Sequence, residues 1–203
     1  MTELSKVTTM LSQYEWLTDK DQRDRWVGVY IGILAVFLAV CGMGGGNAAK
    51  DATRANIEAS STWNFFQAKN ARRNQIRLQV DDIELRLATD GSLNDAAKAK
   101  YQERIKTYKE LDARLTSDKK SNEGLDELFL KGKALEAERD VAMRKDPYFD
   151  YAQALLQIAI VLATVVLIVP QVWLLGVSAM VGVLGVILMM NGFTLAVAIP
   201  GIG

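Results

Sequence analysis

The chain has 203 residues with 24 basic and 24 acidic side chains, so its formal net charge is zero and it offers no basic patch for nucleic acid. It has no histidine and one cysteine, which excludes histidine-dependent nucleophiles and the usual zinc, haem and iron sites. The charges are segregated: residues 50–150 hold 20 basic and 19 acidic side chains, and residues 151–203 hold none. Because charged groups normally cover a soluble domain, the uncharged tract is expected to lie in a membrane.

Residues 1–20 open the chain with an amphipathic pattern. Their apolar side chains recur at spacings of three and four: Leu4, Val7, Leu11 and Tyr14. This spacing predicts a helix with one apolar face, which either lies on the membrane surface or packs on a neighbouring subunit. Since Lys6 stands alone as a cation on the central part of this segment, we favour packing on protein.

Residues 26–46 form the first predicted transmembrane helix. The 17 residues at 27–43 are uncharged and cover about 25 Å as a helix, near the lower limit for one crossing. Trp26 and Tyr30 lie where interfacial aromatic residues belong. The glycine triplet at 44–46 is expected to end this helix or to permit a bend.

Residues 47–147 are predicted to form a charged extramembrane domain, an antiparallel coiled coil of two or three helices. The apolar seam of its first helix steps by four, three and four: Ile76, Val80, Ile83 and Leu87. The later helices carry their own seams: Tyr101, Ile105, Tyr108 and Leu115, then Leu125, Leu128, Leu135 and Ala142. Turns are expected at residues 88–92 and 121–124, and Pro147 is expected to interrupt the last helix before the membrane. The outer helices of the domain are expected to continue the spans.

The uncharged C-terminal tract predicts two further spans, residues 151–169 and 172–197, joined by a tight hairpin at Pro170 and Gln171. A helix of 19 residues covers about 28 Å, which is enough for one crossing. Residues 191–203 are too few for another span, so they extend the last helix or lie as an apolar tail. The predicted fold class is therefore an all-α membrane protein with three transmembrane helices and an inserted antiparallel helical coiled-coil domain.

Three crossings place the N-terminus and the hairpin on one side of the membrane, with the inserted domain on the other. Basic residues near the first span do not decide the orientation, because three precede it and four flank the domain: Lys20, Arg23 and Arg25, then Lys50, Arg54, Arg144 and Lys145. Since no cleaved signal peptide is evident, we expect the N-terminus inside and the domain outside.

Two groups of residues are candidates for binding or association. The densest aromatic group of the domain lies on its first helix: Trp63, Phe65 and Phe66, followed by Gln67 and Lys69. In a coiled coil such a group is more often a packing anchor than a pocket for a small molecule or quinone. Small residues four apart let membrane helices approach closely, as in two pairs here: Gly28 with Gly32, and Ser178 with Gly182.

The stretch at residues 59–76 (ASSTWNFFQAKNARRNQI) has Trp63 and further aromatics followed by Gln67, Ala68 and Lys69, shortly after a first apolar span. It resembles the bacterial membrane family catalogued as domain of unknown function 4337, and residues 151–162 (YAQALLQIAIVL) are similar to the matching part of that family. The resemblance implies a helical protein of the bacterial inner (cytoplasmic) membrane without an established activity. The N-terminus would then be cytoplasmic and the helical domain periplasmic. The family's hairpin often carries basic residues, whereas this one does not.

The sequence favours a protein without enzymatic activity, because no catalytic, metal or cofactor residue is identified. No carboxylate or base lies within the predicted spans, which argues against a self-contained transporter. We expect a structural or accessory membrane protein that contacts lipids and assembles as a homo-oligomer or as a subunit of a larger membrane complex. One alternative is a ligand- or lipid-sensing protein that binds through the helical domain. Another is a pore formed by several copies of the last two helices.

Overall fold

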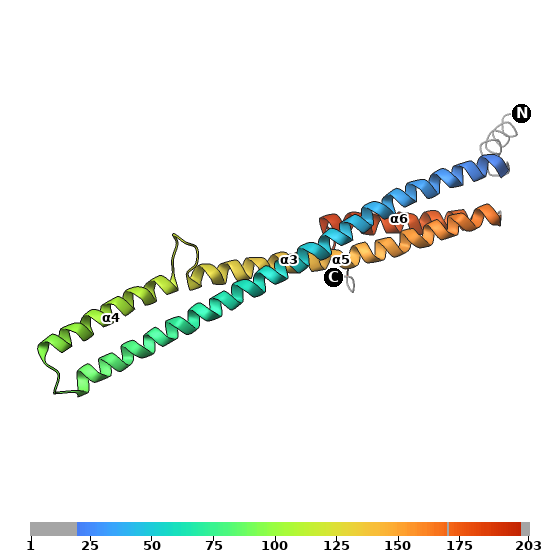
Figure 1. Ribbon diagram of the computed structural model, residues 1–203. Helices are drawn as coiled ribbons and strands as arrows, with labels where there is room; N and C mark the ends of the chain where they lie inside the picture. The colour runs from blue at the N-terminus through green and yellow to red at the C-terminus, as the bar shows by residue number, and fades with distance from the viewer. Residues whose placement is uncertain (1–19, 170, 200–203) are drawn as a thin grey trace, which may run out of the picture. The chain divides into compact units, whose positions relative to one another are not determined.

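The computed structural model describes residues 20–169 and 171–199, so the amphipathic helix predicted for residues 1–20 lies outside the described residues, apart from Lys20. The described residues form helices and connections, with no strand. The helices follow in the order α3 (Lys20–Thr89), α4 (Asp95–Thr116), α5 (Leu125–Ile168) and α6 (Val172–Thr194) (Figure 1). The chain divides into two compact units, unit 1 (Met1–Asp51 and Val141–Gly203) and unit 2 (Ala52–Asp140). The prediction of an all-helical fold is confirmed.

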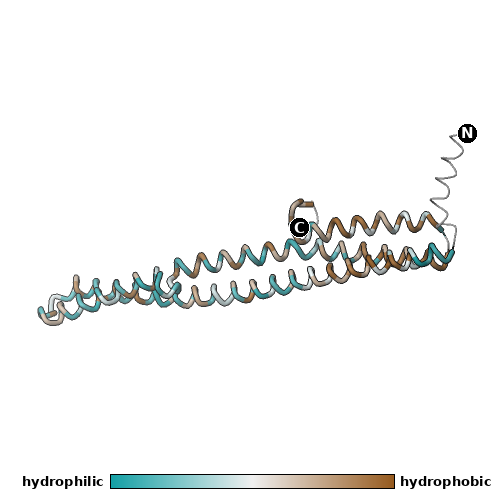
Figure 2. The backbone as a smooth tube through the Cα atoms, turned by 90° about the horizontal axis from the view of Figure 1, so that it is seen from above, coloured by the Kyte–Doolittle hydropathy of each residue, from teal (hydrophilic) through white to brown (hydrophobic). Residues whose placement is uncertain are grey.

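Three helices, α3, α5 and α6, are long and apolar enough to cross a membrane. Their apolar stretches belong to unit 1, where hydrophobic residues predominate along the tube in Figure 2. The inserted charged region predicted from the sequence corresponds closely to unit 2.

The three apolar helices of unit 1 pack side by side around a core of small and medium side chains (Figure 1). On α3 the buried positions recur every seven residues: Val27, Leu34, Cys41 and Ala48. On α5 two such rows are buried: Phe149, Leu156 and Ala163, and Ala152, Ala159 and Val166. A seven-residue repeat keeps one stripe of a helix against its neighbours, and the alanines let the helices approach closely.

The glycine triplet at 44–46 does not end the first helix, since α3 continues unbroken through it. A Cβ at Gly44 would lie 2.8 Å from Phe149 Cζ, closer than two carbon atoms pack. Phe149 is 2% exposed and packs edge to face on Phe193, with the ring centroids 4.9 Å apart. The prediction of a helix end here is therefore wrong, and the glycine makes room for an aromatic ring.

Pro147 lies inside α5, so the interruption predicted there does not occur. A proline inside a helix removes a backbone donor and crowds the preceding turn, which costs about 3 kcal/mol. The next two side chains, Tyr148 and Phe149, are each 2% exposed, and their burial offsets that cost. The continuous α5 takes part in both units.

The last helix ends at Thr194, three residues before the predicted limit, where Leu195 takes a left-handed φ of 50°. The Asn191 side chain holds the turn, because Nδ2 donates to the Val197 carbonyl at 2.8 Å and Oδ1 accepts from the Val197 N–H at 2.9 Å. The Tyr148 hydroxyl donates to the same carbonyl at 3.2 Å and accepts from the Ile199 N–H at 3.0 Å. Residues 195–199 therefore form a short tail fastened to α5 and α6.

In unit 2, α4 lies alongside the later part of α3, as the views in Figures 1 and 2 both show. The predicted seams contribute many of its buried apolar side chains: Ile76 and Val80 on α3, Leu115 on α4, and Leu125, Leu128 and Leu135 on α5. Two ion pairs join α3 to α4, Arg77 with Asp112 at 2.8 Å and Glu84 with Lys109 at 2.9 Å. The two connections of the domain, residues 90–94 and 117–124, overlap the predicted turns at 88–92 and 121–124.

Candidate functional site

The predicted aromatic group packs α3 against α5 within unit 2. The ring of Trp63 meets Phe66 and Phe129 edge to face, with centroid distances of 5.6 Å in each pair. Phe66 and Phe129 are 6.4 Å apart, which completes a cluster of three rings. The indole Nε1–H of Trp63 donates to Glu136 Oε1 at 2.9 Å. Trp63 therefore uses both its apolar ring and its polar atom to join the two helices.

Gly132 on α5 receives the indole ring. A Cβ at this position would lie 2.8 Å from both Cε2 and Cζ2 of Trp63, so any larger residue would push the ring away. Lys133 donates to the Glu136 carboxylate at 2.8 Å, and this bond, followed by the one from Trp63, lowers the pKa of Glu136. Sequence reasoning missed Phe129, Gly132 and Glu136; the available signal was an isolated glycine inside a helical pattern.

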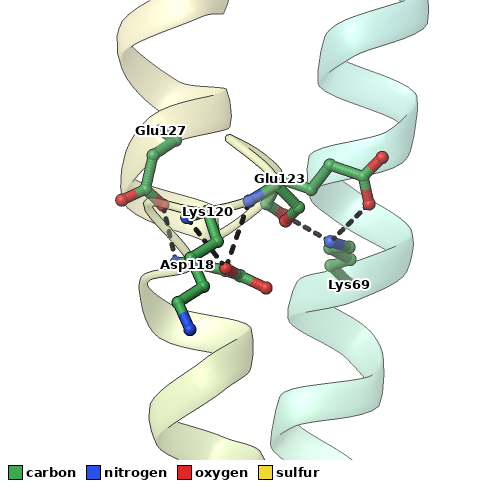
Figure 3. Close-up of polar contacts among 6 residues, drawn as sticks. Lys69, Asp118, Lys120, Glu123 and Glu127 are labelled. Carbon is green, nitrogen blue, oxygen red and sulfur yellow. Dashed lines mark hydrogen bonds and ion pairs between the residues drawn. The ribbon is translucent and has the colours of Figure 1, made fainter.

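The other predicted members of the aromatic group lie outside the three-ring cluster. Phe65 is 41% exposed and Gln67 is exposed, so neither is packed between helices. The Lys69 ammonium lies 4.7 Å from the centroid of the Phe65 ring. It also donates to the backbone carbonyl of Glu123 and lies 3.5 Å from the carboxylate of that residue (Figure 3). Lys69 thus fastens α3 to the connection between α4 and α5.

That connection is ordered by two carboxylates (Figure 3). Asp118 Oδ1 accepts from the backbone N–H of Lys120 at 3.1 Å and of Ser121 at 3.3 Å. Glu127 accepts from the Ser117 hydroxyl at 2.6 Å and from the Asp118 N–H at 3.1 Å. These bonds favour the charged carboxylates, so the pKa of Asp118 is lowered chiefly by Ser121 and that of Glu127 chiefly by Ser117.

We expect the connection between α4 and α5 to loosen in acid. Because the folded state lowers both pKa values, the stabilisation is fully present above the ordinary carboxylate pKa and is lost as the pH falls through the folded-state values. Hydrogen exchange at the amides of Asp118, Lys120 and Ser121, corrected for intrinsic rates, should accelerate below about pH 4. Glu127→Gln is the control and should already exchange faster at neutral pH. An acid-independent corrected rate would contradict the assignment.

A cavity of about 420 Å³ lies beside the three-ring cluster, lined by Phe66, Arg73, Leu125, Asp126, Phe129 and Leu130. Arg73 Nη2 donates to Asn70 Oδ1 at 3.0 Å. Its Nε is buried and has no hydrogen-bond partner among the described residues, which costs roughly 1–3 kcal/mol for a polar group. The cavity volume lies in the range of small-molecule sites.

One pair of predicted helix-association residues is used inside unit 1. Ser178 is fully buried, its hydroxyl donates to the Ala159 carbonyl at 2.7 Å, and it lies 3.2 Å from the Tyr30 hydroxyl. A Cβ at Gly182 would lie 3.1 Å from Leu34 Cδ2, tighter than ordinary carbon contacts. Ser178 and Gly182 therefore let α6 pack closely on α3 and α5 of the same chain.

The other pair, Gly28 and Gly32 on α3, is exposed. A Cβ at either glycine would meet no heavy atom within 4 Å. Ala35 and Ala39 continue the same pattern of small residues and are also exposed. We call these four residues the small-residue face of α3. It is a surface of the kind that lets helices approach closely, and it packs on no other helix in the part of the chain that the structure describes.

Among residues 20–169 and 171–199, no three His, Cys, Asp or Glu side chains gather in a way that could hold a metal ion. Cys41 is fully buried, and its thiol donates to the Phe149 carbonyl at 3.2 Å, as a small core residue would.

Comparison with known proteins identifies a family that the chain matches. The family described as Domain of unknown function (DUF4337) matches residues 23–195, which confirms the resemblance drawn from residues 59–76. No curated protein and no solved structure matches the chain.

Proposed function

We propose that the chain, which belongs to the family described as Domain of unknown function (DUF4337), is a non-catalytic structural protein that spans a membrane three times and assembles as a homo-oligomer. The length and apolar composition of α3, α5 and α6 support the spanning role. The inserted domain would then stand outside the lipid, since all 20 basic and 19 acidic side chains of residues 50–150 belong to it or to its borders.

The observation that carries the proposal is the exposed small-residue face of α3. In lipid, helices gain little from the hydrophobic effect, so their association depends on close packing between small residues. Within the chain, Ser178 and Gly182 already make close helix contacts of this kind. Gly28 and Gly32 offer an equivalent surface with open space above it. A second copy of the chain is the partner that an otherwise unoccupied face of this kind suits best.

We expect Gly32→Leu to convert the oligomer to a monomer. The added side chain meets open space in one chain, so folding is preserved, while close approach of a neighbouring helix is blocked. The monomer fraction, measured by native mass spectrometry from nanodiscs, should rise about tenfold, which for a dimer corresponds to an association about a hundredfold weaker, or roughly 2.7 kcal/mol. Gly176→Leu is the matched control, because Gly176 is also exposed with nothing within 4 Å.

Native mass spectrometry of the unsubstituted protein tests the proposed assembly directly. A monodisperse monomer with no co-purifying partner would refute assembly as the role of this chain. A mass that includes a second polypeptide would replace the homo-oligomer with the related role of a subunit in a larger membrane complex.

A second candidate function, ligand or lipid sensing, is favoured by one observation. The Nε donor of Arg73 is buried without a partner beside a cavity that Phe66 and Phe129 also line. Both rings contact Trp63, so an anionic lipid bound there would alter tryptophan fluorescence. A saturable response that Arg73→Met abolishes would favour this function, and the lack of any saturable response would dismiss it.

A pore built from the last two helices has less support. The exposed large side chains of α6 are all apolar: Val172, Trp173, Val177, Met180, Val183, Leu184, Ile187, Met190 and Phe193. A conducting path needs polar groups that replace the hydration shell of an ion. This face suits lipid contact better than a water-filled channel.

A further inference from the structure

The outward side of α3 in unit 2 has no charged side chain for six turns. Its buried side is marked by Ala55, Thr62 and Ile76, which lie at multiples of seven residues from one another. A residue two positions further on lies about 200° around a helix, on the opposite side. Moving two positions on from each place in this seven-residue repeat gives the central row of the opposite side: Ile57, Asn64, Ala71 and Leu78. We call this row and its neighbours, Ser61, Ala68 and Gln75, the outer face of α3.

Every residue of the outer face is exposed, and Ile57 and Leu78 are 62% and 68% exposed. The same stretch of α3, residues 57–78, carries five charged side chains, all off this face: Glu58, Lys69, Arg72, Arg73 and Arg77. Charge returns at both ends, with Arg54 seven residues before Ser61 and Asp82 seven residues after Gln75. A helix face that only meets water has no reason to exclude charge, whereas the core of a protein interface is depleted of it.

We propose that a second copy of the chain covers the outer face of α3, with the two α3 helices parallel and in register. This inference rests on the proposed function, because two copies inserted in one membrane in the same orientation present α3 in the same direction. About a two-fold axis along the helices, each residue of the face meets its own counterpart. Any charge on the face would then meet a like charge.

Self-pairing explains the composition of the face better than a partner of different sequence does. Such a partner could carry opposite charges, so charge on this face would be tolerated and would even improve recognition. Asn64 lies within the central row, and its side chain both donates and accepts hydrogen bonds, so two copies can bond to each other. A buried Asn pair of this kind fixes register in parallel helix pairs. Ala68, Ala71 and Ser61 are small enough for close approach.

The test uses the full-length protein in nanodiscs, with Cys41→Ala to remove the native thiol. Oxidation of Asn64→Cys should give a disulfide-linked dimer, because the two copies of this position face each other within the short reach of a disulfide. Arg72→Cys is the matched control, since Arg72 is exposed on the same helix but off the outer face. Its dimer yield should be about tenfold lower.

Charge inserted at Ala71 tests the symmetry directly. Ala71→Lys and Ala71→Glu should each reduce the Asn64→Cys dimer about tenfold, because like charges then meet across the interface. When the two variants are co-expressed with different tags, the dimer should return and should link mainly unlike copies. Neither substitution disturbs the packing of one chain, since Ala71 is exposed.

Equal cross-linking from Asn64→Cys and Arg72→Cys, or indifference to charge at Ala71, would overturn the inference. Native mass spectrometry of the same samples separates this failure from that of the proposed function. If the protein is an oligomer but Asn64→Cys does not cross-link, the pairing of the outer face is wrong and the proposed function stands. A parent protein that is monomeric overturns both.

Discussion

Replacing Gly185 with leucine is expected to displace α6 from the packed helices of unit 1. A Cβ at Gly185 would lie 3.0 Å from Leu156 Cγ, 3.2 Å from the Ala152 carbonyl oxygen and 3.3 Å from Leu155 Cβ. Leu156 is fully buried and the Ala152 oxygen belongs to the backbone, so neither can move aside cheaply. Overpacking of a core costs about 1–3 kcal/mol, and we expect the upper end here.

The free energy of unfolding, measured by titration with SDS in mixed micelles, should therefore fall by about 3 kcal/mol in Gly185→Leu. Gly176→Leu on the same helix is the control, because Gly176 is exposed with no heavy atom near its Cβ position. Its stability should stay level or rise by up to about 1 kcal/mol, since leucine favours helix over glycine. Equal losses in the two variants would mean that Gly185 is not at a close helix contact.

The boundaries inside unit 2 follow from local chemistry and were therefore predictable. The connection after α3 covers residues 90–94, and the connection before α5 ends at Gly124, both rich in Gly, Asn, Asp and Ser. Such residues stabilise turns with their own side chains or tolerate left-handed backbone, as Asn122 does with a φ of 55°. The apolar seams were predictable for the same reason, because burial of one stripe imposes its spacing on the sequence.

The errors occur where a distant contact overrides a local rule. Gly44 and Pro147 both signal a break in a helix, yet α3 and α5 continue through them. The ring of Phe149 fills the space at Gly44, and the burial of Tyr148 and Phe149 offsets the cost of the proline. Neither contact can be read from spacing, because Gly44 and Phe149 are far apart along the chain and Tyr148 bonds to Val197, 49 positions away.

The candidate association residues show the same limit. Gly28 with Gly32 and Ser178 with Gly182 have identical spacing, but one pair is open and the other is filled by side chains of the same chain. The spacing of small residues indicates that another helix can approach closely. Only the fold shows whether that second helix belongs to the same chain. The aromatic group behaved similarly: Trp63 was identifiable from sequence, whereas its acceptor Glu136, 73 residues away, was not.

Trp63→Ala is expected to loosen α5 from α3 in unit 2. The substitution removes the ring that fills the space at Gly132 and contacts Phe66 and Phe129. Loss of a large core aromatic costs about 3–5 kcal/mol, and we expect about 3 kcal/mol here because Trp63 is only partly buried. The free energy of local opening, measured by hydrogen exchange of the amides around Phe129 and Gly132, should fall by that amount.

Two further variants separate the roles of Trp63. Phe65→Ala should change exchange little, because Phe65 is 41% exposed and lies outside the three-ring cluster. Trp63→Phe keeps a ring but loses the bond to Glu136, so its effect should fall between the other two. If Trp63 is a packing anchor, Trp63→Ala should lose protection from hydrogen exchange even when no ligand is added. If exchange in Trp63→Ala matched that in Phe65→Ala, Trp63 would be free for binding, and ligand sensing would become the better account of this cluster.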